Sequence, residues 1–164
     1  ERFGKTKLGG LLLYAKQSQQ MTLIEEVYEL IAPRIRRLIT QKQIDAVGFI
    51  PPTLSRSVQF QKELERLLAL DMPKVDIIKV TNGIPVAQKT LSHLSDRVEN
   101  AAHTIVVASR RAYRNILLID DALGSGATLN ETARKISEAK LVSGKLIGVV
   151  ITGSFKGFDV LNEV

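Results

Sequence analysis

The segment Asn115–Glu131, with the sequence NILLIDDALGSGATLNE, predicts a buried strand, a short loop and the start of a helix. Residues 116–119 form a continuous apolar run, which is typical of a strand covered on both faces of a parallel sheet. Asp120 and Asp121 follow directly. We therefore expect both carboxylates where this strand emerges at the carboxyl edge of the sheet, the edge at which open α/β sheets bind ligands.

The segment 124–127 after the two acids has only small side chains, so that successive backbone N–H groups can converge on an anion. Thr128 and Glu131 have the spacing of a capping box, and Leu129, Ala133 and Ile136 give one apolar stripe, so we expect a helix to begin at Thr128. Loop amides, the helix dipole and the Thr128 hydroxyl would then bind a phosphate. This predicted phosphate loop comprises Leu123, Gly124, Ser125, Gly126, Ala127 and Thr128.

Two common phosphate loops do not fit this segment. A P-loop has Lys directly before its Ser or Thr, and Ala127 occupies that place; a dinucleotide fingerprint has a third Gly where Leu129 stands. The ribose-binding acid of the dinucleotide fold also comes about twenty residues after the loop, whereas here the acids precede it. A compact ribose 5-phosphate, with its hydroxyls over the acids and its phosphate on the loop, suits this order better.

The same segment resembles the phosphoribosyl pyrophosphate signature of the type I phosphoribosyltransferases, which has an apolar strand, an acid pair, two spacer residues and a small-residue loop ending in Thr. A plain strand-to-helix turn with a capping box is the alternative, but such a turn needs no adjacent acids. The resemblance implies an α/β fold with a mostly parallel twisted sheet of about five strands, flanked by helices and carrying a flexible flap.

A second loop is expected at the same sheet edge. The apolar run 45–50 ends in Pro51 and Pro52, which cannot continue a central strand. The resemblance implies that this loop handles pyrophosphate, and its candidate residues are Pro52, Thr53, Ser55 and Arg56. A turn followed by a helix cap at Ser55 or Ser57 is equally compatible with the sequence.

The polar stretch 81–100 resembles, in its segments QKTLS (88–92) and RVEN (97–100), the ComF-like, competence-associated branch of the same family. In the family this stretch is a flap over the active site. The resemblance therefore gives Lys89 and Arg97 a catalytic role as phosphate-facing cations, since a positively charged flap would neutralise pyrophosphate and exclude water. The alternative is a solvated helical face.

The remaining pattern predicts one domain over residues 1–164, with residues 1–10 as a poorly ordered lead-in. We expect an edge strand at 11–15, an amphipathic helix at 22–40 that Pro33 kinks or splits, and a helix at 57–70. Leu23, Val27, Leu30, Ile31 and Ile35 should face inward from the long helix. Further strands are expected at 75–80, 104–108 and 145–152, all in a single right-handed α/β sheet.

Composition narrows the classes of function. The chain is 45% hydrophobic and 24% charged, as in globular proteins, and it has no Cys and two His, which argues against a disulfide framework or a transition-metal site. No apolar run reaches the ~20 residues of a membrane span and no secretory leader pattern is present, so we expect a cytoplasmic protein without membrane contacts. The net charge of +6 favours anionic ligands.

Two functions are compatible with these patterns. The first is a Mg²⁺-dependent phosphoribosyltransferase, a pentosyltransferase of nucleotide metabolism, that binds phosphoribosyl pyrophosphate or a nucleoside monophosphate; Asp120 and Asp121 would hold the ribose hydroxyls. Mg²⁺ would be held mainly by substrate oxygens, with Asp120 and Asp121 as its candidate protein ligands. The 6-oxopurine enzymes carry an Asp where Gly124 stands, which argues against hypoxanthine and guanine as acceptors.

The second is a non-catalytic phosphoribosyl pyrophosphate or nucleotide-binding module in competence or DNA uptake. Its support is a basic cluster, Arg110, Arg111 and Arg114, which precedes the signature strand and so should lie at the opposite, amino edge of the sheet. The cluster is a candidate nucleic-acid contact, or simply a solvated turn. The sequence is also compatible with a homodimer.

Overall fold

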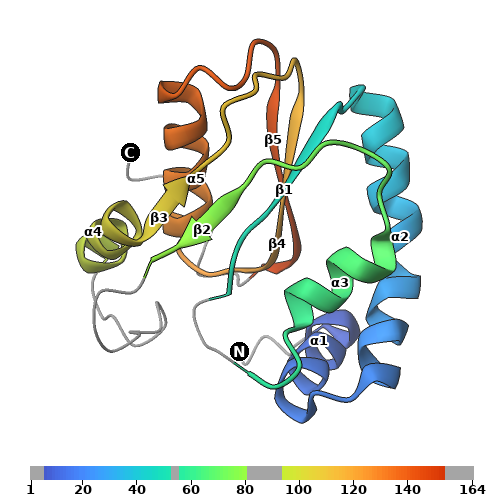
Figure 1. Cartoon of the computed structure of the whole chain (residues 1–164). Coiled ribbons are helices and arrows are strands. Elements are labelled where there is room, and N and C mark those ends of the chain that lie inside the picture. Colours follow the sequence, from blue (N-terminus) through green and yellow to red (C-terminus); the bar gives the residue numbers. More distant parts are fainter. Residues whose placement is uncertain (1–5, 53–55, 81–93, 154–164) are drawn as a thin grey trace.

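A three-stranded parallel sheet lies between two groups of helices in the computed structural model, which describes residues 6–52, 56–80 and 94–153 (Figure 1). The strands follow the order β1-β4-β5, with β1 at Ala46–Phe49, β4 at Ile116–Leu123 and β5 at Leu146–Gly153. Ile119 of β4 pairs with Phe49 on one side and with Val149 on the other. The predicted α/β fold with a helix-flanked parallel sheet is therefore confirmed.

The central strand β4 is buried on both faces, as its continuous apolar run predicts. Leu117 and Ile119 pack into one hydrophobic core with α1, α2 and α3, whereas Ile116 and Leu118 pack into a second core with α5. All four side chains are at most 1% exposed. Burial of each of these large side chains therefore contributes about 1.5 to 3 kcal/mol of transfer free energy.

The first helical layer consists of α1 (Lys7–Ser18), α2 (Met21–Lys42) and α3 (Phe60–Leu68), all on one face of the sheet (Figure 1). The prediction of an edge strand at 11–15 was wrong, and part of the expected lead-in is the first turn of α1. Thr6 caps this helix, since its hydroxyl accepts from the Gly9 N–H at 3.0 Å. Leu12 and Ala15, three residues apart on the helix, are the buried positions that tie α1 to the core.

The long helix α2 confirms the amphipathic pattern predicted for residues 22–40. It begins one residue earlier, after an N-cap at Gln20, and it is not split at Pro33. Pro33 and Glu29, whose carbonyl loses its helical donor, are both exposed, so water can hydrogen-bond that carbonyl. Leu30, expected to face inward, is 52% exposed, because the apolar stripe that reaches the core is narrower than predicted.

The second helical layer is α5 (Ala127–Glu138), with α4 (Leu94–Thr104) packed against it. Next to these helices β2 (Ile77–Lys79) and β3 (Ile105–Val107) form a separate antiparallel pair. The expectation of a single sheet was therefore wrong for the described residues. The 104–108 run turns back against the 75–80 run, so these two strands pair with each other.

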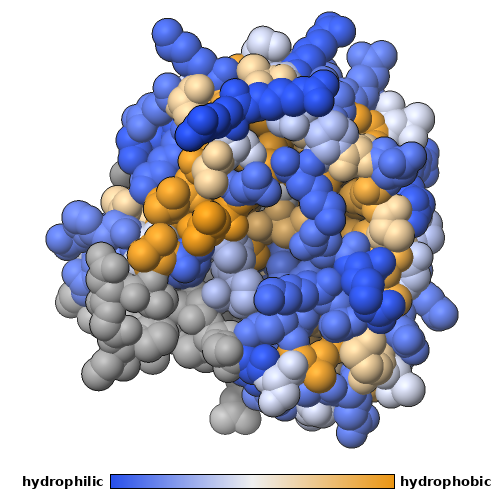
Figure 2. Space-filling view, viewed as in Figure 1, coloured by the Kyte–Doolittle hydropathy of each residue, from blue (hydrophilic) through white to orange (hydrophobic). Residues whose placement is uncertain are grey.

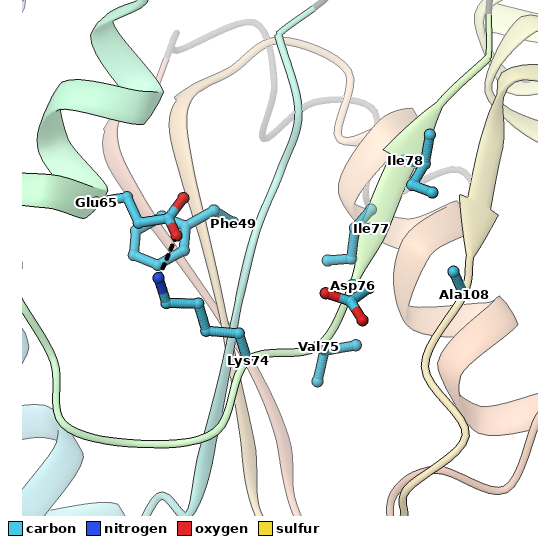
Figure 3. A pocket seen from close by; sticks show the side chains of 8 residues that line it. All are labelled: Phe49, Glu65, Lys74, Val75, Asp76, Ile77, Ile78 and Ala108. Carbon is cyan, nitrogen blue, oxygen red and sulfur yellow. Dashed lines mark hydrogen bonds and ion pairs between the residues drawn. The ribbon is translucent and has the colours of Figure 1, made fainter.

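The chain leaves the parallel sheet just before β2. Val47 of β1 exchanges hydrogen bonds with the neighbouring segment, accepting from the Val75 N–H at 2.7 Å and donating to the Pro73 carbonyl at 3.0 Å. Beyond this point the segments separate around a cavity of about 330 Å³, lined on one side by Phe49 and on the other by Ile77 and Ile78 (Figure 3). An ion pair between Lys74 and Glu65 of α3, 2.5 Å long, lies beside Phe49 in the lining of this cavity (Figure 3).

The outer face of the β2–β3 pair is apolar. Ile78 and Val106 lie opposite each other in the pair and are 49% and 42% exposed. Figure 2 shows hydrophobic side chains gathered over these strands, surrounded by hydrophilic ones. Among the described helices, none is both long enough and apolar enough to cross a membrane.

Candidate functional site

The two acids of the signature lie within β4 rather than after it. β4 continues to Leu123 because β5 runs beside it that far, pairing Ala122 with Thr152 and Leu123 with Gly153. Successive strand residues point to opposite faces, so Asp121 lies on the face of Ile119 and Asp120 on the face of Leu118. The acids nevertheless lie near the carboxyl edge of the sheet, as the sequence predicts.

Each acid meets a lysine from the layer on its own side. Lys16, in the last turn of α1, places its Nζ 2.5 Å from Oδ2 of Asp121. Lys79, at the end of β2, acts electrostatically on Asp120. The two acids are also linked to each other, since the Asp121 backbone N–H donates to Oδ1 of Asp120 at 2.8 Å.

Asp120 has an unusual protonation equilibrium. Burial raises its pKa to about 7, and the negative charge of Asp121 contributes in the same direction. The Asp121 N–H, Lys16 and Lys79 oppose this rise without cancelling it. Burial also lowers the pKa of Lys79. A strongly perturbed acid at a sheet edge is typical of functional sites, because such sites need a group that changes charge near neutral pH.

Neither lysine was identified from the sequence. Lys16 belongs to no motif and lies 105 residues from its partner, so only the packing of α1 on the sheet reveals it. Lys79 did give a signal, because it interrupts the apolar run 75–80 near its end. A lone charge at the end of a buried strand often lies at a ligand edge, and this feature could have marked it.

The turn after β4 has the open backbone expected of a phosphate loop. Gly124 is exposed, and a side chain added there would meet no atom within 4 Å. Gly126 has φ +76°, a left-handed conformation that favours glycine, and it directly precedes α5. The described residues therefore leave the first N–H groups of α5 facing an uncrowded turn.

The helix begins at Ala127, one residue earlier than predicted, and the capping box does not form. Gly126 is the N-cap and offers no side-chain acceptor, while Ser125 Oγ accepts weakly from the Ala127 N–H at 3.4 Å. Glu131 turns away from the helix start and binds Arg134, with Nη2 to Oε1 at 2.7 Å and Nε to Oε2 at 2.8 Å. The predicted apolar stripe does pack against the sheet.

β1 ends at the same edge of the sheet as β4, because the two strands are parallel. Thr53 and Ser55 lie outside the described residues, and Pro52 is exposed. Arg56, a candidate residue of the pyrophosphate loop, donates from Nη1 to the Lys16 carbonyl at 2.8 Å. The structure thus joins this loop to the end of α1, whose Lys16 side chain reaches Asp121.

The flap residues are only partly described. Lys89 lies outside the described residues, whereas Arg97 lies half-buried on α4, which packs against α5. The charged groups that act on Asp120 include Asp121, Lys16 and Lys79.

The basic cluster of Arg110, Arg111 and Arg114 precedes β4, at the edge of the sheet opposite the acids, as predicted. All three residues are exposed, and the Arg111 guanidinium lies 5.4 Å from the centre of the Tyr113 ring. The cluster is therefore separated from the acid pair by the length of the strand.

A divalent cation could find two carboxylates at the acid pair. In the residues that the structure describes, no group of three or more acidic, His or Cys side chains could enclose a metal ion. Because the two acids lie on opposite faces of β4, each offers one carboxylate, and Mg²⁺ commonly takes one or two protein ligands and completes its shell with water and substrate phosphate oxygens.

Comparisons with known proteins show which fold this is. No family model matches the sequence, and no curated protein matches it. Among solved structures, an adenine phosphoribosyltransferase aligns with a TM-score of 0.55 at 12% identity, over 89% of this chain and 78% of that one. The Saccharomyces cerevisiae adenine phosphoribosyltransferase, complexed with adenine and an imino-altritol bisphosphate, gives 0.52 at 13%, over 88% and 77%. The chain therefore has the α/β fold of the type I phosphoribosyltransferases.

Proposed function

We propose that this chain binds phosphoribosyl pyrophosphate and acts as a phosphoribosyltransferase. The observation that carries the proposal is the arrangement at the carboxyl edge of β4: an adjacent acid pair, an open glycine turn and an uncapped helix start. Asp120 and Asp121 would accept hydrogen bonds from the ribose hydroxyls. The turn and the first N–H groups of α5 would bind the 5-phosphate.

The proposed reaction is displacement of pyrophosphate from C1 of the ribose by a nitrogen of an acceptor base. Its transition state carries positive charge on the sugar, so it is favoured by fixed negative charge and correct positioning. The carboxylates of β4 supply that charge. Mg²⁺ held mainly by substrate oxygens, with Asp120 or Asp121 as a protein ligand, would offset the charge of the leaving group.

Cations must also face the pyrophosphate. Lys79 is the described residue best placed for this role, because it already acts on Asp120 and is the second-to-last residue before the segment 81–93. Lys89 and Arg97 remain the proposed flap cations. Arg56 binds the Lys16 carbonyl through Nη1 and would use its other N–H donors for a phosphate oxygen.

The acceptor base is the open part of the proposal. Gly124 stands where the 6-oxopurine enzymes carry an Asp, so it offers no carboxylate to hypoxanthine or guanine. Two structural neighbours with TM-scores above 0.5 are adenine phosphoribosyltransferases, which makes adenine the first base to test.

The decisive experiment combines binding and turnover. Calorimetry with phosphoribosyl pyrophosphate and Mg²⁺ should show binding, and a panel of bases should then release pyrophosphate. The variant Asp120→Asn/Asp121→Asn should lose binding, since each hydrogen bond to a charged group contributes about 1.5 to 3 kcal/mol. Asp71→Asn, which changes an exposed acid after α3, is the matched control. A double variant that binds like the parent would refute the role of the acids.

Thr128 offers a second, milder test of the site. It lies in the first turn of α5, and its hydroxyl is the side-chain group proposed to bind the 5-phosphate. Thr128→Val keeps the shape and removes the hydroxyl, so the affinity should fall about tenfold. An unchanged affinity would leave the 5-phosphate to the backbone amides alone.

A binding module without turnover, of the ComF-like kind, is the second candidate, and the exposed basic cluster at the far edge favours it. Both candidates use the same ligand site. Binding of phosphoribosyl pyrophosphate without pyrophosphate release in the presence of any base would support the module.

A further inference from the structure

Gln61 is a buried polar residue that contacts the strand of the acid pair. It lies in the first turn of α3, is 4% exposed, and its Nε2 donates to the Ile119 carbonyl at 2.8 Å. The same carbonyl accepts from the Ile50 N–H at 2.9 Å. Both lone pairs of this oxygen are therefore used, and the last carbonyl before Asp120 is held from two elements.

The end of β1 explains why a side chain is needed at this point. Alternate residues of β1 face β4, so the next donor after Ile50 would be residue 52, which is a proline without an N–H group. Gln61 supplies an additional donor here, from the helical layer that covers this face of the sheet (Figure 1).

The other polar atom of Gln61 is not explained by this contact. Its Oε1 is also buried and has no hydrogen-bond donor among the described residues. The amide cannot be turned round, because only its NH₂ group can donate to the Ile119 carbonyl. A buried acceptor without a donor destabilises the folded state, and an apolar side chain would avoid that cost. Such a residue is expected where function requires it.

The segment 56–58, just before α3, is tied to the end of α1. The Val58 N–H donates to Gln19 Oε1 at 2.9 Å, and Arg56 Nη1 donates to the Lys16 carbonyl at 2.8 Å. The stretch that leads from Arg56 into α3 thus contacts α1 directly and β4 through Gln61.

We propose that Gln61 is a positioning residue of the ligand site, which couples the segment 56–58 to the strand that carries Asp120 and Asp121. A phosphate group bound by Arg56 would then hold the two acids in place for the sugar. The identity of the ligand rests on the function proposed above, whereas the coupling through Gln61 does not.

This coupling favours a ligand that contacts both regions at once. Phosphoribosyl pyrophosphate can do so, because it carries a sugar for the acids and a pyrophosphate for Arg56. Ribose 5-phosphate offers the sugar without the pyrophosphate. The contribution of Gln61 should therefore appear as a difference between the affinities for these two ligands.

The first experiment uses the ligand-free protein. Gln61→Met keeps nearly the length of the side chain and removes both polar atoms, and Gln41→Met, at an exposed glutamine of α2, is the matched control. The backbone NMR signals of Asp121 and Val58 should both shift in Gln61→Met, because the contact that joins β4 to α3 is lost. They should match the parent in Gln41→Met. Shifts confined to the immediate neighbours of Gln61 would overturn the coupling.

The stability of the same variants is measured by denaturant unfolding. The midpoint of Gln61→Met should stay close to that of the parent, since one hydrogen bond and one unsatisfied acceptor are lost together.

The second experiment measures binding of phosphoribosyl pyrophosphate and of ribose 5-phosphate, each with Mg²⁺, by calorimetry. Gln61→Met should lower the affinity for phosphoribosyl pyrophosphate about tenfold and the affinity for ribose 5-phosphate much less. A purely structural role would lower both affinities equally. Equal losses, or an unchanged affinity for phosphoribosyl pyrophosphate, would overturn the proposal.

Failure of the parent to bind phosphoribosyl pyrophosphate would refute the proposed function and leave the NMR result to decide on Gln61. If Gln61→Met does not fold, Gln61→Leu, which removes the same two polar atoms, replaces it in all measurements.

Discussion

At the scale of single residues, the fold buries a carboxyl group, Asp120, whose charged form is disfavoured by burial. Asp120 is held in a site that raises its pKa to about 7. Folding at neutral pH must therefore desolvate a carboxylate, and part of the stability of the fold is lost for the sake of the site. Conflicts of this kind between local preference and structure are expected at functional positions.

The pH dependence of stability follows from this carboxyl. The folded pKa of Asp120 lies above its ordinary value of 3.8, so the folded state binds more protons between those two values. Stability from this group is complete below about pH 4 and falls as the pH rises to about 7. Asp120→Asn should remove this fall and raise the free energy of unfolding at pH 8 by at most about 4 kcal/mol.

Urea denaturation at several pH values measures this effect. Asp71→Asn, which changes an exposed acid, serves as the control and should follow the parent. A parallel pH profile for Asp120→Asn and the parent would contradict the raised pKa.

Glu131 illustrates the opposite case, a buried acid that supports the fold. It is 7% exposed, binds Arg134 through two hydrogen bonds and lies 3.6 Å from the Lys135 ammonium. These partners, Arg134 first, lower its pKa against the opposing effect of burial. Its contribution is therefore complete at neutral pH and is lost as the pH falls below its ordinary value of 4.5.

Glu131→Gln should lower the free energy of unfolding by about 1 to 3 kcal/mol, because charged hydrogen bonds of a buried group are lost. Glu138, which pairs with the same arginine but is 61% exposed, provides the control, and Glu138→Gln should cost at most about 1 kcal/mol. Thermal unfolding of the two variants gives the comparison. Equal losses would show that burial does not matter here.

At the scale of elements, the amino ends of the three parallel strands are joined through Asn115. Its Nδ2 donates to the Lys42 and Gln43 carbonyls at 3.2 and 2.9 Å, and its Oδ1 accepts from the Lys145 N–H at 2.8 Å. Its own N–H donates to Asp45 Oδ1 at 2.6 Å. One 5% exposed amide thus connects the end of α2, the start of β4 and the entry to β5.

Asn115→Ala should destabilise the protein by roughly 2 to 4 kcal/mol, because it leaves three partly buried backbone groups without their side-chain partner. Gly144→Ala should damage the same junction, since its Cβ would lie 2.6 Å from Asn115 Oδ1 and 2.7 Å from the Arg114 carbonyl. Asn130→Ala, on the exposed side of α5, is the control. Denaturant unfolding of the three variants measures the effect. If Asn115→Ala and Gly144→Ala had the same denaturant midpoint as Asn130→Ala, Asn115 would not support this junction.

At the scale of the whole molecule, the two candidate binding regions lie at opposite ends of β4. The acids and the glycine turn lie at the carboxyl edge, while the basic cluster of Arg110, Arg111 and Arg114 lies at the amino edge. The two ends share no charged contact in the described residues, so a ligand at one edge should bind independently of the other.

Changing all three arginines of the basic cluster to Gln should therefore leave the affinity for phosphoribosyl pyrophosphate unchanged. If the cluster binds nucleic acid, the same variant should lose salt-dependent retention of DNA, with a shallower dependence of binding on salt concentration. Calorimetry and filter binding at several salt concentrations separate the two effects. A loss of phosphoribosyl pyrophosphate affinity would contradict the separation of the two edges.

The local sequence determined those elements that depend only on residues close to them along the chain. The run 116–119 is apolar at every position, so it had to be covered on both faces, and the small residues 124–127 that follow the acids form the turn and the helix start. The amphipathic pattern of α2 fixed that helix in the same way. These features depend on spacings of a few residues, which a sequence displays directly.

The tertiary structure decided what depends on distant partners. The run 11–15 is apolar enough for a strand, but burial of Leu12 and Ala15 against the sheet made it a helix. That choice brings Lys16 to Asp121, 105 residues away, just as the turning of β3 against β2 brings Lys79 to Asp120. Charge pairs of this kind leave no periodic trace in a sequence, because they are set by how layers pack and not by the residues between them.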